Sequence, residues 1–345
     1  MTKAGLIVVL LVASAGVSSE PVRAQASSAN SHAREQFKNA IAQYDWVTNT
    51  KGQRIRTIVT RPKNAPGKVP VIFFVGWLSC DSIEYVNGES DAFGAIFWRL
   101  IETSGFATMR TDKPGVGESE GNCATTDFQT ELDSYRVVLD SLNKYDFIDQ
   151  KKIFVIGLSN GGGFAPLVIG DHSVRGFVAA SPWGRTWYEH MLELERGRLS
   201  RDSQLTSAQI NEAMKAFTDF YSLYLMHGQT PGQVLAAHPE WKSLWYDGPD
   251  GQYGRPAAFY QQLQALNLGK VWHEVSAPVL VLHGTADTIM SRADSVTIAD
   301  TVNRTHPGHA EFVEVEGADH LLASRNKLID SVVPTILVWL RKQLN

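Results

Sequence analysis

Short apolar runs alternate with amphipathic segments along most of the chain. Apolar runs of strand length lie near residues 70–75, 106–110, 153–156, 176–180, 278–283 and 310–315. Segments with helical apolar spacing lie near residues 91–104, 127–145, 161–169, 292–302 and 324–344. Because strands that alternate with helices form βαβ units, this pattern predicts an α/β protein with a largely parallel sheet and helices on both faces.

The residues before this alternation have a different pattern. Residues 27–42 are polar and predict a leader or a short helix. Residues 44–48 and 54–60 have strand-like composition, and Asn49-Thr50-Lys51-Gly52 between them is typical of a turn. We therefore expect a hairpin before the parallel strands.

The alternation breaks between residues 183 and 270. Residues 186–199 and 207–227 have helical apolar spacing, whereas residues 228–256 are rich in Gly and Pro and predict irregular loops. This interval is longer than a connection between two strands requires. It predicts a largely helical cap insertion, residues 183–270, between two parts of one core, residues 27–182 and 271–345.

The apolar run at residues 153–156 ends in Gly157-Leu158-Ser159-Asn160-Gly161. Gly-x-Ser-x-Gly between a strand and a helix is typical of a nucleophile elbow, a tight turn that holds a serine hydroxyl above the sheet. The glycines leave room for the chain to close, and the helix behind the serine directs the Asn160 N–H toward an oxyanion. We predict Ser159 as the nucleophile and Asn160 as an oxyanion donor.

A serine nucleophile requires a base that accepts its proton and a carboxylate that orients the base. Asp287 and His320 follow the last two predicted strands. Since the carboxyl ends of parallel strands meet at one edge of a sheet, both side chains can reach Ser159. Asp319 is a second candidate for the acid, but adjacent side chains in a loop diverge, so we favour Asp287.

The order nucleophile, acid, histidine resembles the α/β-hydrolase superfamily. Residues 71–77 resemble its oxyanion-loop strand, and residues 112–119 resemble its D-x-x-G-x-G-x-S turn. The resemblance covers about residues 45–345 outside the cap insertion, and it implies the α/β-hydrolase fold. Val75-Gly76 stands where the family has His-Gly. The second oxyanion donor is therefore the N–H of either Trp77 or Leu78, and we favour Trp77.

The predicted set of residues gives a mechanism that requires no metal or organic cofactor. His320 would accept the Ser159 proton during attack on a carbonyl, Asp287 would hold the imidazole, and the Asn160 and Trp77 N–H groups would bind the oxyanion. Water activated by the same histidine would then hydrolyse the acyl-enzyme. No histidine or cysteine spacing is typical of a zinc site.

Composition and the N-terminus limit the partners and the location. The chain has 345 residues, is 43% hydrophobic and carries a formal net charge of −4, so it has no basic field for nucleic acid. Lys3, apolar residues 6–12 and the small residues up to Ala26 resemble a secretory signal peptide, which predicts a secreted or periplasmic protein. We expect cleavage after Ala26, and Ala15 marks a second candidate site. The apolar stretch is shorter than the roughly 20 residues that span a bilayer, so no stable membrane anchor is expected after cleavage.

Export would allow the two cysteines to pair. Cys80 follows the predicted oxyanion loop and Cys123 follows the turn at residues 112–119. In the topology that the resemblance implies, both loops lie on the crevice side of the sheet. We predict a Cys80–Cys123 disulfide, and closing a loop of about 43 residues contributes on the order of 4 kcal/mol in the chain-entropy treatment.

The cap insertion is rich in aromatic residues. At this density aromatic side chains more often pack helices together than line a pocket, but a cap insertion forms the roof of a site, and ligand pockets are mostly apolar. The candidates for substrate binding are Trp183, Trp187, Tyr188 and Trp245.

The favoured function is a secreted or periplasmic serine hydrolase that cleaves a carboxylic ester or related acyl bond in a small molecule or peptide. The first alternative is a serine exopeptidase of the same superfamily, in which Glu189 or Glu193 would bind a free amino terminus. A hydrolase-like binding protein without activity is a remote alternative, because the three predicted catalytic residues are intact.

Overall fold

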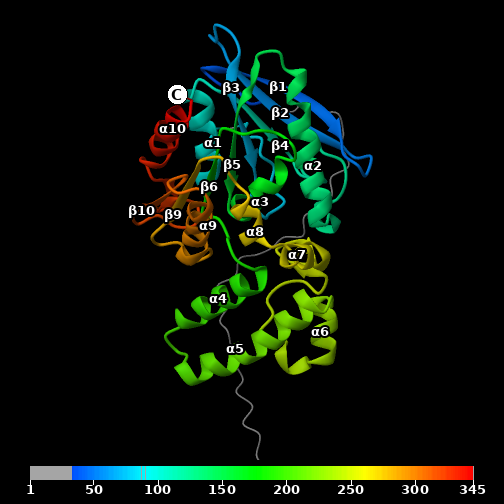
Figure 1. Cartoon of the computed structure of the whole chain (residues 1–345). Coiled ribbons are helices and arrows are strands. Elements are labelled where there is room, and N and C mark those ends of the chain that lie inside the picture. The colour runs from blue at the N-terminus through cyan, green and yellow to red at the C-terminus, as the bar shows by residue number, and fades with distance from the viewer. Residues whose placement is uncertain (1–32, 87, 90, 345) are drawn as a thin grey trace, which may run out of the picture.

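The computed structural model describes residues 33–344, apart from residues 87 and 90. Eight strands form one sheet in the order β1-β2-β4-β3-β5-β6-β9-β10, with helices on both faces (Figure 1). The strands are β1 (Ala40–Thr48), β2 (Arg54–Pro62), β3 (Val69–Val75), β4 (Ala107–Thr111), β5 (Ile148–Leu158), β6 (Gly176–Ala180), β9 (Val279–Gly284) and β10 (Ala310–Val315). The predicted fold class is confirmed, whereas the predicted signal peptide at residues 1–26 lies outside the described residues.

The six neighbouring strands β4, β3, β5, β6, β9 and β10 run parallel, and β2 runs opposite to both of its neighbours. β1 pairs antiparallel with β2, and β2 pairs antiparallel with β4. Of the two alternatives predicted for residues 27–42, a leader or a short helix, the helix is wrong within the described part, because residues 33–39 form no helix and β1 begins at Ala40. Residues 40–42, which are apolar, pair with the end of β2 and so satisfy their backbone hydrogen bonds in the sheet.

Alternate residues of each central strand face opposite sides of the sheet. In β3, Phe73 belongs to the core beneath α2, α3 and α9, and Ile72 and Phe74 belong to the core beneath α1 and α10. The helices of these layers are α1 (Ala92–Thr103), α2 (Phe128–Asp140), α3 (Asn160–Val168), α9 (Arg292–Thr305) and α10 (Val332–Lys342). Burial on both faces explains the unbroken apolar runs in the sequence.

Helix α10 begins later than the prediction for residues 324–344. A small hairpin of β11 (Ala323–Ser324) and β12 (Lys327–Leu328) occupies the first part of that range. Its two turn residues, Arg325 and Asn326, have φ angles of 50° and 62°. Two successive residues with positive φ make a tight hairpin turn, which ends the helical pattern there.

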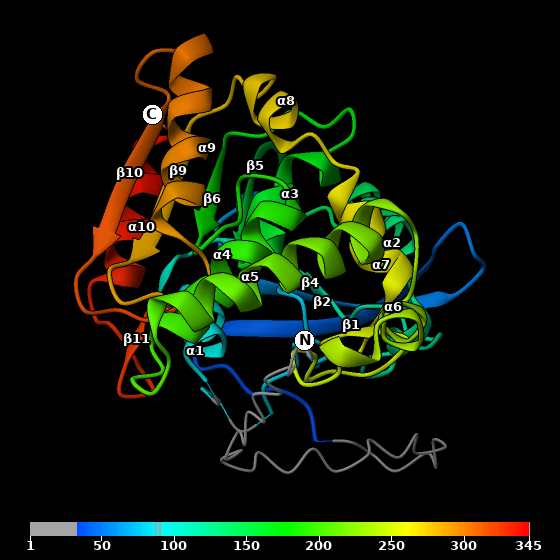
Figure 2. The same cartoon turned by 90° about the horizontal axis from the view of Figure 1, so that it is seen from below.

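The chain between β6 and β9 forms several helices, which lie across the carboxyl ends of the strands (Figures 1 and 2). They are α4 (Trp187–Ser200), α5 (Ser207–Tyr221), α6 (Pro231–Ala237), α7 (Ala257–Gln264) and α8 (Leu268–His273), with a hairpin of β7 (Gly251–Gln252) and β8 (Arg255–Pro256). Shorter helical turns are η1 (Cys123–Thr125), η2 (Ser141–Lys144), η3 (Ser222–Met226) and η4 (Pro239–Trp241). Helix α8 packs against α3 and α9, so the boundary predicted at residue 270 falls inside a helix beside the sheet.

The prediction of irregular loops over residues 228–256 is only partly correct. Helix α6 forms there because the Thr230 side chain accepts a hydrogen bond from the Gln233 N–H, and the Gln233 side chain bonds back to the Thr230 N–H. The same reciprocal capping starts α4 at Thr186 and α5 at Thr206. Local side-chain chemistry therefore fixes where three helices of the cap insertion begin.

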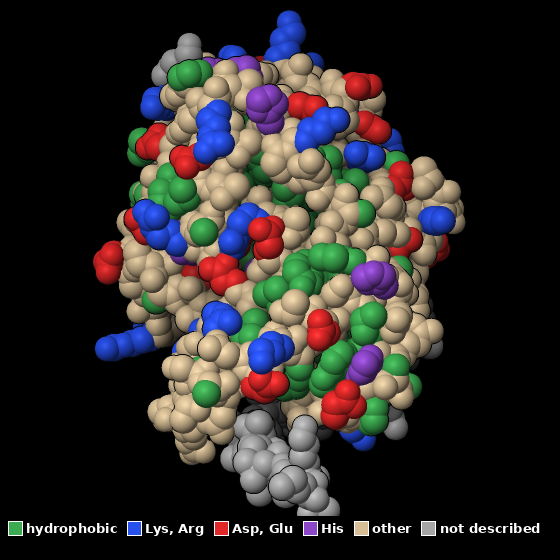
Figure 3. All heavy atoms as spheres, turned by 60° about the horizontal axis from the view of Figure 1, so that its bottom comes forward, with side chains coloured by type: hydrophobic (Ala, Val, Ile, Leu, Met, Phe, Trp, Pro, Cys, Tyr) green, Lys and Arg blue, Asp and Glu red, His purple; other side chains and the backbone are tan. Residues whose placement is uncertain are grey.

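Hydrophobic side chains form a band near the centre of the face that Figure 3 shows, and charges of both signs are interspersed around it. No helix in the described part of the chain is long and apolar enough to span a bilayer.

Candidate active site

Ser159 lies in the tight turn between β5 and α3. Its φ of 55° is in the left-handed region, which residues with a side chain rarely adopt. The turn therefore holds Ser159 in a strained backbone conformation. A Cβ on Gly157 would lie 2.5 Å from the Gly161 carbonyl oxygen, and a Cβ on Gly161 would lie 2.2 Å from that of Gly76. Only glycine fits at both positions, as the sequence motif requires.

The structure brings the predicted base and acid to Ser159. The Ser159 hydroxyl lies 3.0 Å from His320 Nε2, and His320 Nδ1 lies 2.9 Å from Asp287 Oδ2. The other Asp287 oxygen accepts hydrogen bonds from the backbone N–H groups of Ile289 and Met290. This carboxylate is buried and held at both oxygens, so it can fix one orientation and one tautomer of the imidazole.

The rival acid, Asp319, has other partners. Its Oδ1 accepts hydrogen bonds from the backbone N–H groups of Leu321 at 2.9 Å and Ala323 at 3.0 Å. Those bonds shape the loop that carries His320. Asp319 therefore supports the loop, and Asp287 is the carboxylate that contacts the imidazole.

Two backbone N–H groups are placed to receive an oxyanion. Asn160 is the first residue of α3, where N–H groups have no intrahelical acceptor. The Trp77 N–H donates to no group in the described part of the chain, and both residues line the same cavity as Ser159. The Leu78 N–H also donates to no group in the described part of the chain, so Leu78 stays an alternative to Trp77 as the second oxyanion donor.

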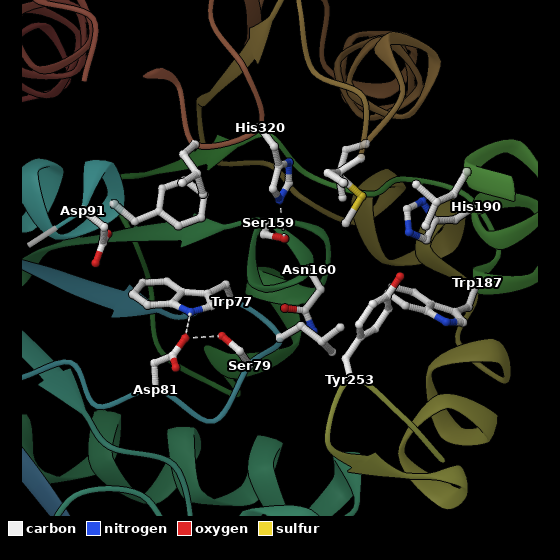
Figure 4. A pocket seen from close by; sticks show the side chains of 16 residues that line it. Trp77, Ser79, Asp81, Asp91, Ser159, Asn160, Trp187, His190, Tyr253 and His320 are labelled. Atoms are coloured by element: carbon white, nitrogen blue, oxygen red, sulfur yellow. Dashed lines mark hydrogen bonds between the residues drawn. The ribbon is translucent and has the colours of Figure 1, made fainter. Parts of the chain in front are cut away.

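A cavity of about 490 Å³ opens in front of Ser159 and His320 (Figure 4). Its apolar lining residues are Trp77, Leu78, Phe93, Trp187, Leu194, Tyr253, Ile289, Met290 and Leu321. They come from the loop after β3, from α1, from the cap insertion and from the loops after β9 and β10. The site is therefore mostly apolar, as small-molecule pockets are.

Of the four predicted substrate-binding residues, only Trp187 lines this cavity. Trp183 is fully buried beneath α4, and its indole N–H donates to the Asn160 carbonyl at 3.0 Å. Tyr188 donates its hydroxyl to the Thr218 carbonyl, and Trp245 stacks on Phe220. The prediction is wrong for these three cavity contacts, because their rings pack elements of the fold together.

Sequence reasoning did not select His190, which also lines the cavity. It lies one turn after Trp187 on α4, and the two ring centroids are 4.7 Å apart. Burial lowers the pKa of His190 to about 4, although the Asp294 carboxylate opposes this shift. The imidazole is therefore neutral near pH 7. Its spacing of three residues from Trp187 was the signal in the sequence.

The sequence analysis also did not predict two carboxylates that line the cavity, those of Asp81 and Asp91. Asp81 accepts hydrogen bonds from the Trp77 indole and the Ser79 hydroxyl, and Asp91 accepts the Gly94 N–H at the start of α1. None of the described lining residues is Lys or Arg. The predicted alternatives, Glu189 and Glu193, lie outside this lining: Glu189 caps α4 and Glu193 pairs with Arg185.

The Asn160 side chain is an unpaired polar group at the cavity. The residue is fully buried, and both amide atoms lack a hydrogen-bond partner in the described structure. An unpaired buried amide costs about 1–3 kcal/mol for each group left without a partner.

The predicted disulfide is present. Cys80 and Cys123 are bonded, with their Cα atoms 6.0 Å apart. The bond joins the end of the loop after β3 to the segment after β4. No group of His, Cys, Asp or Glu residues in the described part of the chain could hold a metal ion.

Fold and site together define a serine hydrolase of the α/β-hydrolase class. Residues 86–324 match the model of the family described as serine aminopeptidase S33, and the chain belongs to that family. No curated protein sequence matches the chain.

Three solved structures illustrate the likeness. Est1E from Butyrivibrio proteoclasticus with bound ferulic acid has 16% identity over 87% of this chain and 97% of that chain, with a TM-score of 0.55. A thermostable esterase from Pseudomonas putida has 18% identity over 90% and 83%, with a TM-score of 0.52. DcsB in complex with its substrate analogue has 18% identity over 88% and 99%, with a TM-score of 0.57. At these identities the likeness is one of fold.

Proposed function

We propose that the protein hydrolyses a carboxylic ester through an acyl-enzyme on Ser159. The observation that carries this proposal is the hydrogen-bonded chain from Ser159 through His320 to Asp287, whose first two members line an apolar cavity. A serine hydroxyl without such a base is a weak nucleophile. The separation of 3.0 Å between Ser159 and His320 suits direct proton transfer.

The reaction follows from this arrangement. His320 accepts the Ser159 proton as the hydroxyl oxygen attacks the ester carbonyl, and Asp287 stabilises the imidazolium that forms. The N–H groups of Asn160 and Trp77 bind the oxyanion, and His320 then protonates the leaving alkoxide. Water deprotonated by His320 attacks the acyl-enzyme and releases the acid and free Ser159.

The cavity lining favours an apolar or aromatic group of moderate size. Trp77 lies on one side of Ser159, and Trp187 and Tyr253 lie on the other (Figure 4). The Phe93 ring packs against Trp77 with the two centroids 5.4 Å apart. The aromatic acid bound by Est1E is a ligand of this kind. We place the acyl or alcohol group of the ester between these two sides.

The location of the protein is part of the same proposal. The signal-like N-terminus, residues 1–26, favours export. The Cys80–Cys123 disulfide supports it, because such bonds persist mainly in oxidising compartments. We therefore place the activity outside the cytoplasm.

A second candidate is removal of an N-terminal amino acid from a peptide. The family description and the two carboxylates at the cavity, Asp81 and Asp91, favour it. Asp81 already accepts two hydrogen bonds, and Asp91 caps α1. A protonated amine would therefore compete with bonds within the protein, which is why ester hydrolysis is preferred.

The first test is labelling of the mature chain with a fluorophosphonate, which reacts with an activated serine. We expect labelling of the unaltered protein and its loss in Ser159→Ala. Ser181→Ala is the matched control, because Ser181 also has a positive φ of 48° and a buried hydroxyl but does not line the cavity. A folded, unaltered protein that does not label would support the inactive binding protein instead.

The second test distinguishes ester from peptide substrates. It compares p-nitrophenyl esters of increasing acyl length and methyl ferulate with aminoacyl p-nitroanilides. Higher kcat/KM for the esters supports the proposal, and turnover confined to anilides with a free amino group supports the aminopeptidase. Asp91→Asn separates the two further, because only the amine-dependent reaction loses a charge partner.

A further inference from the structure

The ammonium group of Lys113 is buried beneath the oxyanion loop, residues 76–80. Lys113 follows β4, and the residue is only 6% exposed. Its Nζ donates hydrogen bonds to the carbonyl oxygens of Trp77 and Ser79, the latter at 3.0 Å. One cation therefore holds two carbonyls of a loop that lines the cavity.

Other contacts restrain the same loop. The Gly76 N–H donates to the Tyr135 hydroxyl of α2 at 3.0 Å, and the disulfide fixes Cys80. The Gly76 carbonyl lies against Gly161 of α3. In a trans peptide the N–H points opposite to the carbonyl, so the Trp77 N–H points away from Gly161 and the Leu78 N–H points away from the Lys113 ammonium. The directions of both candidate oxyanion donors thus depend on these carbonyl contacts.

The charge of Lys113 is balanced by several neighbours. Glu131 of α2 lies 3.6 Å from the ammonium and also pairs with Arg255 of β8, which contacts Cys123. Burial is the main cause that lowers the pKa of Lys113 to about 8; Arg255 lowers it further, whereas Glu131 and Asp81 raise it. A buried lysine is costly unless it is paired, so the ion pair with Glu131 offsets part of a large desolvation cost.

We propose that Lys113 is a positioning residue for the oxyanion loop: its bond to the Trp77 carbonyl turns the Leu78 N–H toward the cavity, and its bonds to Trp77 and Ser79 together restrain the loop that carries the Trp77 N–H. The inference rests on the proposed function, because it assigns a role within that reaction. Lys113 does not contact the substrate in this mechanism. It acts through the peptide groups that it binds.

The first experiment replaces Lys113 by Met, which keeps the length of the side chain and removes the donor. The measurements are the rate constant of fluorophosphonate labelling and kcat and KM for p-nitrophenyl butyrate, with the fold checked by circular dichroism. We expect kcat and the labelling rate to fall about 10- to 100-fold, because Lys113 acts on the donors indirectly, whereas outright loss of one oxyanion donor costs about 100- to 1000-fold and a displacement near 1 Å about 100-fold. KM should change less than about threefold, because ground-state contacts remain.

The matched control is Lys63→Met. Lys63 also donates to a backbone carbonyl, that of Phe37 at 2.9 Å, but Phe37 does not belong to the oxyanion loop. We expect its labelling rate to equal that of the unaltered protein. A folded Lys113→Met protein that labels at the unaltered rate would overturn the inference. Absence of labelling in the unaltered protein would instead overturn the proposed function.

The second variant, Glu131→Gln, keeps the experiment decisive if Lys113→Met does not fold. Removing this carboxylate lowers the pKa of Lys113 further, because a negative neighbour no longer favours the ammonium. Loss of the Lys113 charge should weaken its bonds to the two carbonyls, so kcat should decline as the pH rises through the pKa of Lys113. We expect this alkaline decline of kcat to move to lower pH in Glu131→Gln and to keep its position in Lys63→Met. An alkaline decline that does not move in Glu131→Gln would also overturn the inference.

Discussion

Replacement of Asp287 by Asn tests the assignment of the acid most directly. The Asn side chain can still accept the Ile289 and Met290 N–H bonds through its oxygen, so the loop keeps its shape. In the unaltered protein, His320 Nδ1 lies 2.9 Å from the Asp287 Oδ2 acceptor. In Asp287→Asn an NH₂ group, which is a donor, takes the place of that oxygen. His320 must then carry its proton on Nε2, where it cannot accept the proton of Ser159. The expected fall in kcat is about 10⁴-fold, the size of this tautomer effect in serine proteases.

The assay is kcat for p-nitrophenyl butyrate in Asp287→Asn and Asp319→Asn, with thermal melting of both variants. Asp319→Asn is the matched control, because Asn can also accept the Leu321 and Ala323 N–H bonds. We expect its kcat to fall less than about tenfold, since no tautomer changes. Equal losses in the two folded variants, or a larger loss at Asp319, would refute the assignment of Asp287.

Three further predictions concern stability and substrate choice. Reduction of the Cys80–Cys123 bond, whose sequence separation is 43, should lower the free energy of unfolding by about 4 kcal/mol in urea titrations, and unchanged midpoints would contradict this. Burial lowers the pKa of His190 to about 4, so on acidification the unfolded chain protonates this imidazole at a higher pH than the folded chain does. The free energy of unfolding should therefore fall between about pH 6.5 and pH 4, and it should fall less in His190→Gln. Trp187→Leu should shift the ranking of p-nitrophenyl esters by about 10- to 200-fold in relative kcat/KM, whereas Trp245→Phe should not, and identical rankings in both variants would contradict a cavity role for Trp187.

The sheet and the three residues at its edge could be predicted because their signals are local. A buried parallel strand is an apolar run, and its carboxyl end is fixed by the residue where the run stops. Ser159, Asp287 and His320 each follow such an end. Parallel topology then brings them together without any knowledge of side-chain packing.

The cap insertion could not be predicted to the same depth. Whether a ring in this segment reaches the cavity depends on how each helix is rotated about its own axis, and that rotation is set by contacts with distant elements. Trp187 and Tyr188 are neighbours in sequence, yet one faces the cavity and the other bonds to Thr218 of α5. The start of α6 could have been predicted, however, since Thr230-Pro231-Gly232-Gln233 has the pattern of a capping box.

Lys113 and Glu131 illustrate a different limit. Each belongs to a residue type that is usually exposed, and nothing in the sequence near either one shows that both are buried. They become partners only because the loop after β4 and helix α2 pack beneath the oxyanion loop. A pair formed by long-range packing has no local signal.

The cap insertion also contacts the nucleophile helix, and this decides which aromatic substitutions are informative. The indole N–H groups of Trp183 and Trp272 donate to the Asn160 and Gly163 carbonyls of α3 at 3.0 Å and 2.9 Å. A change at Trp183 would therefore alter the carbonyl of a proposed oxyanion donor together with the packing of α4, and its effect on substrate ranking would not separate binding from chemistry. Trp187 lines the cavity, and its indole nitrogen donates to no protein group in the described structure. Substitution of Trp187 therefore removes no hydrogen bond of the described protein, but the ring packs against Trp183 and Tyr260, so thermal melting must accompany the substrate ranking.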